Sequence, residues 1–132
     1  ASGAYEKVHY ALVMAAGAAA IGMPVTLFFT MGASAALLSG HSDKPGWWTL
    51  ASERPATDAA ERDADFKSKG VACLDELLEA CRDLKVKFMV CEMGLVAEGI
   101  ADKPLRNDLE IERTGIVALY GDAGSDGRIV FI

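Results

Sequence analysis

Hydrophobic and polar residues follow one another in blocks that predict alternating helices and strands. Residues 5–21 are apolar on nearly every face, and the polar residues Glu6, Lys7 and His9 all fall in the first turns. This pattern is typical of a helix packed tightly against a sheet. Residues 25–30 read Val-Thr-Leu-Phe-Phe-Thr, which is β-branched and aromatic on both faces. Such a segment predicts a central strand of a parallel sheet.

The second half of the chain continues this alternation. Residues 67–84 carry an apolar stripe with charged residues opposite, and therefore predict an amphipathic helix. Residues 85–91 predict the next strand, and residues 92–100 a short helix after it. The other expected elements are a helical segment at 33–38, a brief strand at 109–111, a helix at 114–120 and a closing strand at 128–132.

The order of these elements indicates the fold class. Strands separated by helical segments imply an α/β protein with a mainly parallel sheet and helices on both faces. The length of 132 residues fits one domain, so we interpret residues 1–132 as a single unit. Residues 39–66 are rich in Gly, Pro, Ser, Asp and Arg and show no strong periodicity. A connection of this kind is usually a functional lid, a partner-binding loop or a disordered segment.

One long uncharged run needs an interpretation of its own. No charged residue occurs between Tyr10 and Gly40, a length at which a membrane helix is an alternative. Gly22 and Pro24 break the helical pattern after about 17 residues, and a strand-like segment follows. We therefore read the run as helix, turn and buried strand, and we expect no membrane span. No basic segment or cleavage site of a secretory signal opens the chain.

Charge and cysteine content narrow the function classes. The formal net charge of −6 disfavours nucleic acid and anionic lipid as partners, because both would repel an acidic protein. The three cysteines lie eight and ten residues apart, which matches no zinc pattern, and only two histidines could assist them. We expect no metal, no cofactor, and reduced thiols in a cytoplasmic protein.

Cys91 is predicted to lie at the position where α/β proteins usually have their functional site. Ligands of open α/β sheets bind beyond the carboxyl ends of the strands, and Cys91 closes a predicted buried strand just before a predicted helix. The amides and dipole of a helix N-terminus lower a thiol pKa, which would make Cys91 nucleophilic. The adjacent carboxylate of Glu92 would act in the opposite direction. The alternative is a strand-end cysteine that packs as a small hydrophobe.

The other candidate residues can each be interpreted as structural or as functional. Cys73 and Cys81 are interpreted as core residues of one helix, and the acidic run Asp58, Glu61, Asp63 and Asp65 as a solvated face. An exposed pair of tryptophans, Trp47 and Trp48, more often marks a contact surface than a catalytic group. His9 either faces the strand-end crevice or has a surface or packing role. The expected lining of that crevice is Gly3, His9, Gly32, Glu92, Met93 and Gly94.

Several stretches resemble one known family. They are Glu6-Lys7 with the Ala-rich helix, residues 18–30 (AAAIGMPVTLFFT), residues 74–78 (LDELL), and residues 90–95 (VCEMGL) with Gly99-Ile100. Together they resemble the DsrE/DsrF/TusD family of sulfur-relay proteins, in its DsrE2-like branch. The resemblance implies a three-layer α/β/α domain with about five strands, whose first strand ends near where this chain starts. It also implies a homotrimer or hexamer.

The resemblance also implies a chemistry for Cys91. In the sulfurtransferase members, the cysteine matching Cys91 accepts sulfur as a persulfide and passes it on, so sulfur-donor and sulfur-acceptor proteins are the expected partners. Gly94 departs from the pattern, since many DsrE2-like sequences have Ser there.

Two main hypotheses follow. The first is a sulfur carrier or sulfurtransferase, with the crevice completed around Gly3 and Gly32. The second is a non-catalytic homo-oligomeric binding or assembly protein in which Cys91 only packs. A third, weaker hypothesis is a small anionic ligand in the same crevice. Under the first two, Trp47 and Trp48 are expected to be covered by a neighbouring subunit.

Overall fold

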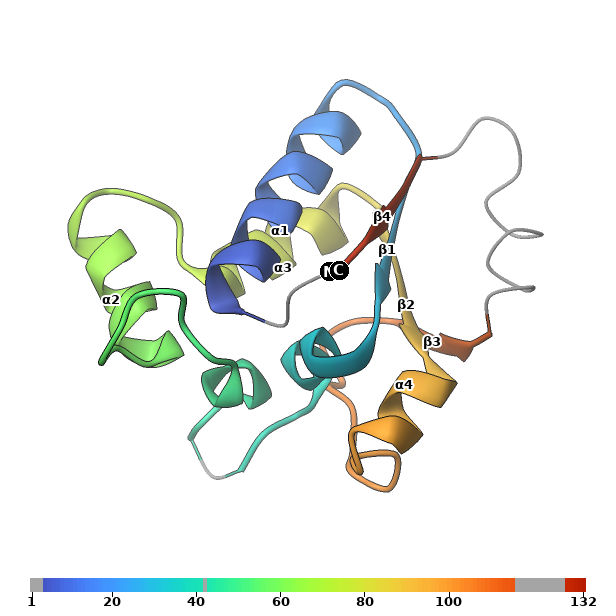
Figure 1. The fold of residues 1–132 in the computed structure, drawn as a ribbon. Helices are drawn as coiled ribbons and strands as arrows, with labels where there is room; N and C mark the ends of the chain where they lie inside the picture. The colour runs from blue at the N-terminus through green and yellow to red at the C-terminus, as the bar shows by residue number, and fades with distance from the viewer. Residues whose placement is uncertain (1–3, 42, 116–127) are drawn as a thin grey trace.

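Four parallel strands form one sheet that is flanked by helices (Figure 1). The computed structural model describes residues 4–41, 43–115 and 128–132. The strands are β1 (Val25–Phe29), β2 (Lys87–Cys91), β3 (Ile111–Thr114) and β4 (Arg128–Phe131), in the spatial order β3-β2-β1-β4. The expected α/β class and parallel sheet are confirmed, with four of the roughly five expected strands in the described residues.

The helices lie around this sheet in two groups. Helix α1 (Tyr5–Ala20) packs against α3 (Leu74–Asp83), and both lie on one side of the sheet in Figure 1. The 3-10 helix η1 (Met31–Leu37) directly follows β1, and α4 (Glu92–Ala97) directly follows β2. Because the strands are parallel, η1 and α4 meet at the carboxyl edge of the sheet, at the lower end of Figure 1.

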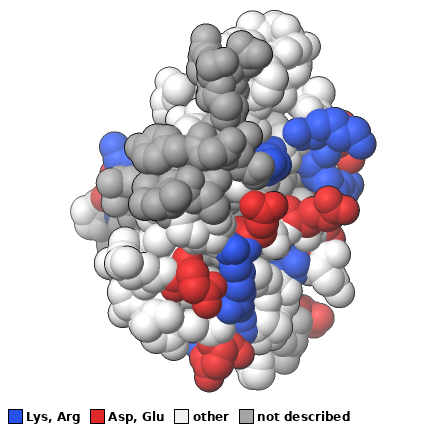
Figure 2. All heavy atoms as spheres, turned by 90° about the vertical axis from the view of Figure 1, so that its right-hand side faces the viewer, with Lys and Arg blue, Asp and Glu red and all other residues white. Residues whose placement is uncertain are grey.

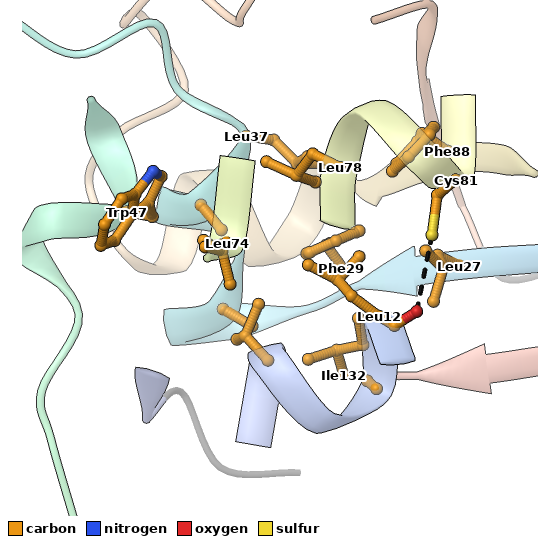
Figure 3. Packing of buried hydrophobic residues seen from close by; sticks show 14 of the residues in the cluster. Leu12, Leu27, Phe29, Leu37, Trp47, Leu74, Leu78, Cys81, Phe88 and Ile132 are labelled. Atoms are coloured by element: carbon orange, nitrogen blue, oxygen red, sulfur yellow. Dashed lines mark hydrogen bonds between the residues drawn. The ribbon is translucent and has the colours of Figure 1, made fainter. Parts of the chain in front are cut away.

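The main core lies between β1, β2 and the helices α1 and α3 (Figure 3). Leu27 and Phe29 of β1 point into it, and Phe29 stacks on Phe88 of β2 with ring centroids 6.4 Å apart. Cys81 is fully buried there, and its thiol lies 3.6 Å from the carbonyl oxygen of Leu12. Alternate residues of the same strands face the other way, where Phe28 and Met89 form a separate buried cluster.

The connection at residues 39–66 is more structured than the sequence suggested. It contains the 3-10 helix η2 (Gly46–Thr49), and helix α2 (Ala59–Ser68) occupies its last part. Helix α2 begins with a capping box, in which the Asp58 side chain accepts a hydrogen bond from the Glu61 backbone amide and the Glu61 side chain accepts one from the Asp58 backbone amide. The prediction of a long loop without periodic structure is therefore wrong for residues 46–49 and 59–66.

The acidic run of this connection is not a simple solvated face. Asp63 is half-buried and accepts hydrogen bonds from the Tyr5 hydroxyl and the Leu74 backbone amide. Asp65 is half-buried as well and forms an ion pair with Arg62 at 2.7 Å. Asp63 therefore holds α2 against α1 and α3, whereas the ion pair of Asp65 lies within α2. The interpretation as a solvated face is wrong for both residues.

Some predicted boundaries shift by several residues. The single helix expected at residues 67–84 is two helices, because the chain turns at Gly70, whose φ is 78°, and restarts at Leu74. Val71 lies in the turn and is exposed instead of joining the apolar stripe. The strand expected at residues 109–111 lies at Ile111–Thr114. Thr114 is thus a strand residue, and the rest of the helix expected at 114–120 falls outside the described residues, apart from Gly115.

The uncharged run folds as helix, turn and buried strand, as expected. It comprises most of α1, a turn at Gly22, strand β1 and η1. In the part of the chain that the structure describes, no helix combines the length and the apolar character needed to cross a membrane.

Ser34 provides a test of the packing of η1. Its hydroxyl is fully buried and has no hydrogen-bond partner among the described residues. Ser34→Ala removes an unsatisfied polar group without changing the shape of the core, so we expect it to raise the free energy of unfolding by about 1 kcal/mol. Thr30→Val is the control and should lower it, because the Thr30 hydroxyl donates a 2.7 Å bond to the Ile132 carbonyl. Urea unfolding of both variants measures the difference, and equal effects would contradict this view of Ser34.

Candidate functional site

Cys91 lies at the carboxyl end of an interior strand. It is the last residue of β2 and the N-cap residue of α4, and its side chain makes no capping hydrogen bond. The side chain is half-buried and packs against the cluster formed by Phe28 and Met89. Its neighbour across the sheet is Thr114 of β3. The structure thus places Cys91 at the edge where ligands of α/β sheets bind.

The charge of Glu92 beside this thiol has a partner that the sequence did not reveal. The carboxylate of Glu92 lies 3.6 Å from the guanidinium of Arg113 on β3, which also donates a 3.1 Å hydrogen bond to the Ala101 carbonyl. Arg113 is 21 residues from Glu92 in the chain, and only the pairing of β2 with β3 brings it here. The negative charge next to Cys91 is therefore offset by a positive one.

Charges of both signs are mixed on this side of the molecule. Figure 2 shows the face that lies on the right-hand side of Figure 1, where acidic and basic side chains drawn there lie next to one another. Neither sign forms a separate patch among the described residues of that view. The described side chains of this view therefore give it no uniform sign of charge.

Gly94 allows α4 to approach the chain that leaves β1. A Cβ atom at Gly94 would lie only 2.8 Å from the backbone nitrogen of Met31, so a side chain there would force the two segments apart. Met31 itself has a φ of 46°, an uncommon value for a residue other than glycine. Cys91, Glu92 and Gly94 are consequently gathered beside the start of η1, which contains Gly32.

The remaining predicted crevice residues are placed differently. Met93 is 79% exposed on α4. His9 is buried in an aromatic cluster, where its ring packs edge-on to Phe66 at 4.7 Å and its Nε2 bonds to the Ala72 carbonyl at 2.8 Å. That environment corresponds to the packing role, so nothing in it links His9 to Cys91. Gly3 lies outside the described residues.

The other two cysteines are in settings that suppress thiol chemistry. Burial raises the pKa of Cys81 to about 11, so this thiol stays protonated at neutral pH. Burial also raises the pKa of Cys73, and a hydrogen bond from its thiol to Glu76 raises it further. Cys73 is the N-cap residue of α3 and is half-buried, so its interpretation as a helical core residue is corrected.

Cys91 lines neither of two hollows found on the surface of the described part of the chain. One has a volume of about 820 Å³ and lies at the starts of β2 and β3, where residues 85–88 and 107–112 line it. The other has a volume of about 1010 Å³ and lies between the segment around Trp48 and residues 100–104. Among the described residues, no group of three or more His, Cys, Asp or Glu is arranged to hold a metal ion.

The fold and the site together define the class of this protein. It is an α/β protein with a parallel sheet, in which a cysteine lies where a central strand meets a short helix. The chain belongs to the DsrE/DsrF-like family, whose model matches residues 2–130. It is similar to the sulfur carrier protein DsrE2 of Allochromatium vinosum, with 32% identity over 68 residues. The similar stretch covers 51% of this chain and 41% of that relative.

Proposed function

We propose that this protein is a sulfur carrier or sulfurtransferase of a sulfur relay, in which Cys91 accepts sulfur as a persulfide and passes it to a partner thiol. The position of Cys91 carries the proposal. It is the one cysteine of the three at the carboxyl edge of the sheet, whereas Cys81 is enclosed in the core and Cys73 is bonded to Glu76. Family membership and the similarity to a sulfur carrier protein support the same chemistry.

The chemistry needs only a thiolate and access to it. The Cys91 thiolate attacks the outer sulfur of a donor persulfide, R–S–SH, so the donor S–S bond breaks and R–S⁻ leaves. Cys91 then carries the outer sulfur as Cys91–S–SH. In the return step, a partner thiolate attacks that outer sulfur and Cys91 leaves as the thiolate. No external oxidant or reductant is consumed.

The surroundings of Cys91 fit these two steps. The sulfur lies at the end of the strand with one side on the apolar cluster of Phe28 and Met89. That packing limits the directions from which a thiol can approach. The Glu92–Arg113 pair borders the site. In this proposal the sulfur donor and acceptor are proteins, and the relay works in the cytoplasm, where thiols are kept reduced.

Intact-protein mass spectrometry tests the proposal. After incubation with glutathione persulfide, we expect one adduct of about 32 Da, which peptide mapping places on Cys91. Cys91→Ser should abolish this adduct. Cys73→Ser is the matched control and should keep it, because it removes a cysteine of similar exposure that lies outside the site. An adduct that survives Cys91→Ser, or equal labelling of all three cysteines, would overturn the proposal.

One observation favours the second candidate function. The contact of Cys91 with the Phe28 and Met89 cluster is what a packing cysteine would make in a non-catalytic binding or assembly protein. The two candidates differ in one measurement. A packing cysteine gains no persulfide, and Cys91→Ser then changes only the stability of the fold.

A further inference from the structure

We propose that the hollow between residues 38–49 and residues 100–104 binds a small anion with a planar apolar body. We call it the loop hollow. It is separate from Cys91, and the proposal does not depend on the sulfur chemistry. In Figure 1 its two walls lie at the lower end of the sheet, where the chain continues from η1 and from α4.

The size and lining of the loop hollow suit a small molecule. Its volume of about 1010 Å³ is at the upper end of the range for sites that bind ligands of drug-like size. Leu38, Ile100 and Pro104 contribute apolar surface. The indole of Trp48 is 38% exposed and stands edge-on to Trp47, with ring centroids 6.2 Å apart. Trp48 therefore offers an open aromatic surface on which a flat ligand can pack.

The charges of the lining select the sign of the ligand. His41, Lys44 and Lys103 line the loop hollow, and no Asp or Glu does among the described residues that line it. This bias occurs in a chain with 19 acidic and 13 basic residues. Asp43 and Asp102 precede the two lysines in the sequence but are exposed outside the lining. Two ammonium groups around an apolar floor are complementary to an anion with an apolar body.

The walls of the loop hollow are held in place before any ligand arrives. The backbone amide of Ser39 donates to Pro104 at 3.0 Å, and that of Arg106 donates to Leu37 at 2.8 Å, so the two segments are joined like strands. His41 and Lys44 exchange two backbone hydrogen bonds of 2.9 and 3.0 Å, which closes a tight turn. A site that is already formed loses little entropy when it binds.

Polar contacts, two of them partly buried, anchor the same walls to the body of the protein. Trp47 is 3% exposed, and its indole nitrogen donates a 3.1 Å hydrogen bond to Asp75 at the start of α3. The guanidinium of Arg106 bonds to the same carboxylate oxygen at 2.9 Å and to both oxygens of Asp108. Trp47 thus fixes the position of Trp48, and Arg106 fixes the opposite wall.

A fluorescent aromatic sulfonate, 8-anilinonaphthalene-1-sulfonate, is the probe for this site. We expect it to bind the folded protein at one saturable site. Lys44→Gln combined with Lys103→Gln should raise its Kd at least about fivefold, an effect sized for two exposed charges. The control is Lys7→Gln combined with Lys67→Gln, which removes the same two charges away from the loop hollow and should leave the Kd within about twofold. Equal weakening by both double variants would overturn the proposal.

The two tryptophans report where the probe binds. In NMR spectra, the indole N–H signal of Trp48 should shift with saturation, whereas that of Trp47, which is bonded to Asp75, should stay in place. The neutral analogue N-phenyl-1-naphthylamine should bind without sensitivity to the lysine variants. Val71→Glu, in the exposed turn before α3, should leave the Kd of the sulfonate unchanged. A shift at neither indole, or loss of binding in Val71→Glu, would place the probe elsewhere and overturn the proposal.

Discussion

Gly46→Ala should destabilise the protein by about 3 kcal/mol or prevent it from folding. A Cβ atom at Gly46 would lie 2.6 Å from the carbonyl oxygen of Ala35 and 2.7 Å from that of Leu38. Both are backbone atoms, so no side-chain rotation relieves the contact. Because Gly46 begins η2 directly before Trp47, the separation of η1 from η2 would also displace the buried indole. Urea unfolding measures the effect.

Gly115→Ala is the matched control for this substitution. Gly115 directly follows β3, and a Cβ atom there would have no neighbour within 4 Å. The free energy of unfolding of this variant should therefore stay within about 0.5 kcal/mol of the wild type. A loss of stability in Gly46→Ala alone would locate the constraint in the contact of η1 with η2. If Gly46→Ala unfolds at the same urea concentration as the wild type, the close approach of these backbones is wrong.

Met14→Glu should dissociate a homo-oligomer into monomers. The exposed face of α1 carries Tyr10, Val13, Met14 and Gly17, and Ile21 continues it as the C-cap residue. From Tyr10 onward this face contains no charged residue. These positions repeat at the spacing of one helix face. An uncharged face of this length is costly to leave in water, and a second copy of the same face covers it without burying an unpaired charge. We therefore propose that α1 meets its own copies.

The exposed face of α1 replaces the tryptophan pair as the expected contact between subunits. Trp47 is buried within its own chain, against Tyr5 and Asp75, so it needs no neighbouring subunit to cover it. The expectation that a neighbour covers both tryptophans is therefore wrong for Trp47, while Trp48 remains partly exposed beside the loop hollow. The number of subunits still rests on the family resemblance, which implies three or six.

Light scattering distinguishes the outcomes. We expect the wild type at about three or six times its chain mass of 14.0 kDa, and Met14→Glu at 14.0 kDa. Val96→Glu is the control, since it places the same charge on another exposed apolar residue, on α4, and should leave the mass unchanged. A wild-type mass of 14.0 kDa would contradict the oligomer. An oligomer that tolerates Met14→Glu but not Val96→Glu would move the contact to α4.

Local sequence patterns were sufficient to predict those helices and strands whose own residues show a clear hydrophobic pattern. The strand at Val25–Phe29 is apolar on both faces and is fully enclosed, because a central parallel strand has no solvent side. Leu74, Leu77, Leu78 and Cys81 are buried on one side of α3, as their spacing predicts. The uncharged run, which a length argument alone would assign to a membrane, was resolved by the residues around Gly22 and Pro24. All of these signals depend on neighbours within a few positions.

Local sequence patterns were not sufficient to predict helix α2. Its sequence is polar, and the acidic residues in it suggested only a solvated face. The capping box formed by Asp58 and Glu61 is a sequence signal that could have marked the start of the helix. The reasons for the acidic residues lie far along the chain, since Asp63 binds Tyr5 and Leu74. Periodicity cannot show such partners. His9 is a similar case, because its hydrogen-bond acceptor is Ala72 and its ring neighbour is Phe66.

The sequence by itself determined the α/β class, the parallel sheet and the position of Cys91 at the end of a strand, because each depends on residue types at short spacing. Tertiary structure alone decided what surrounds that cysteine. Glu92 meets Arg113 through the pairing of β2 with β3, and Gly94 meets Met31 because η1 and α4 share one edge of the sheet. The tertiary structure also decided that Lys44 and Lys103 line one hollow, because contacts between distant segments follow from the packing of the whole chain.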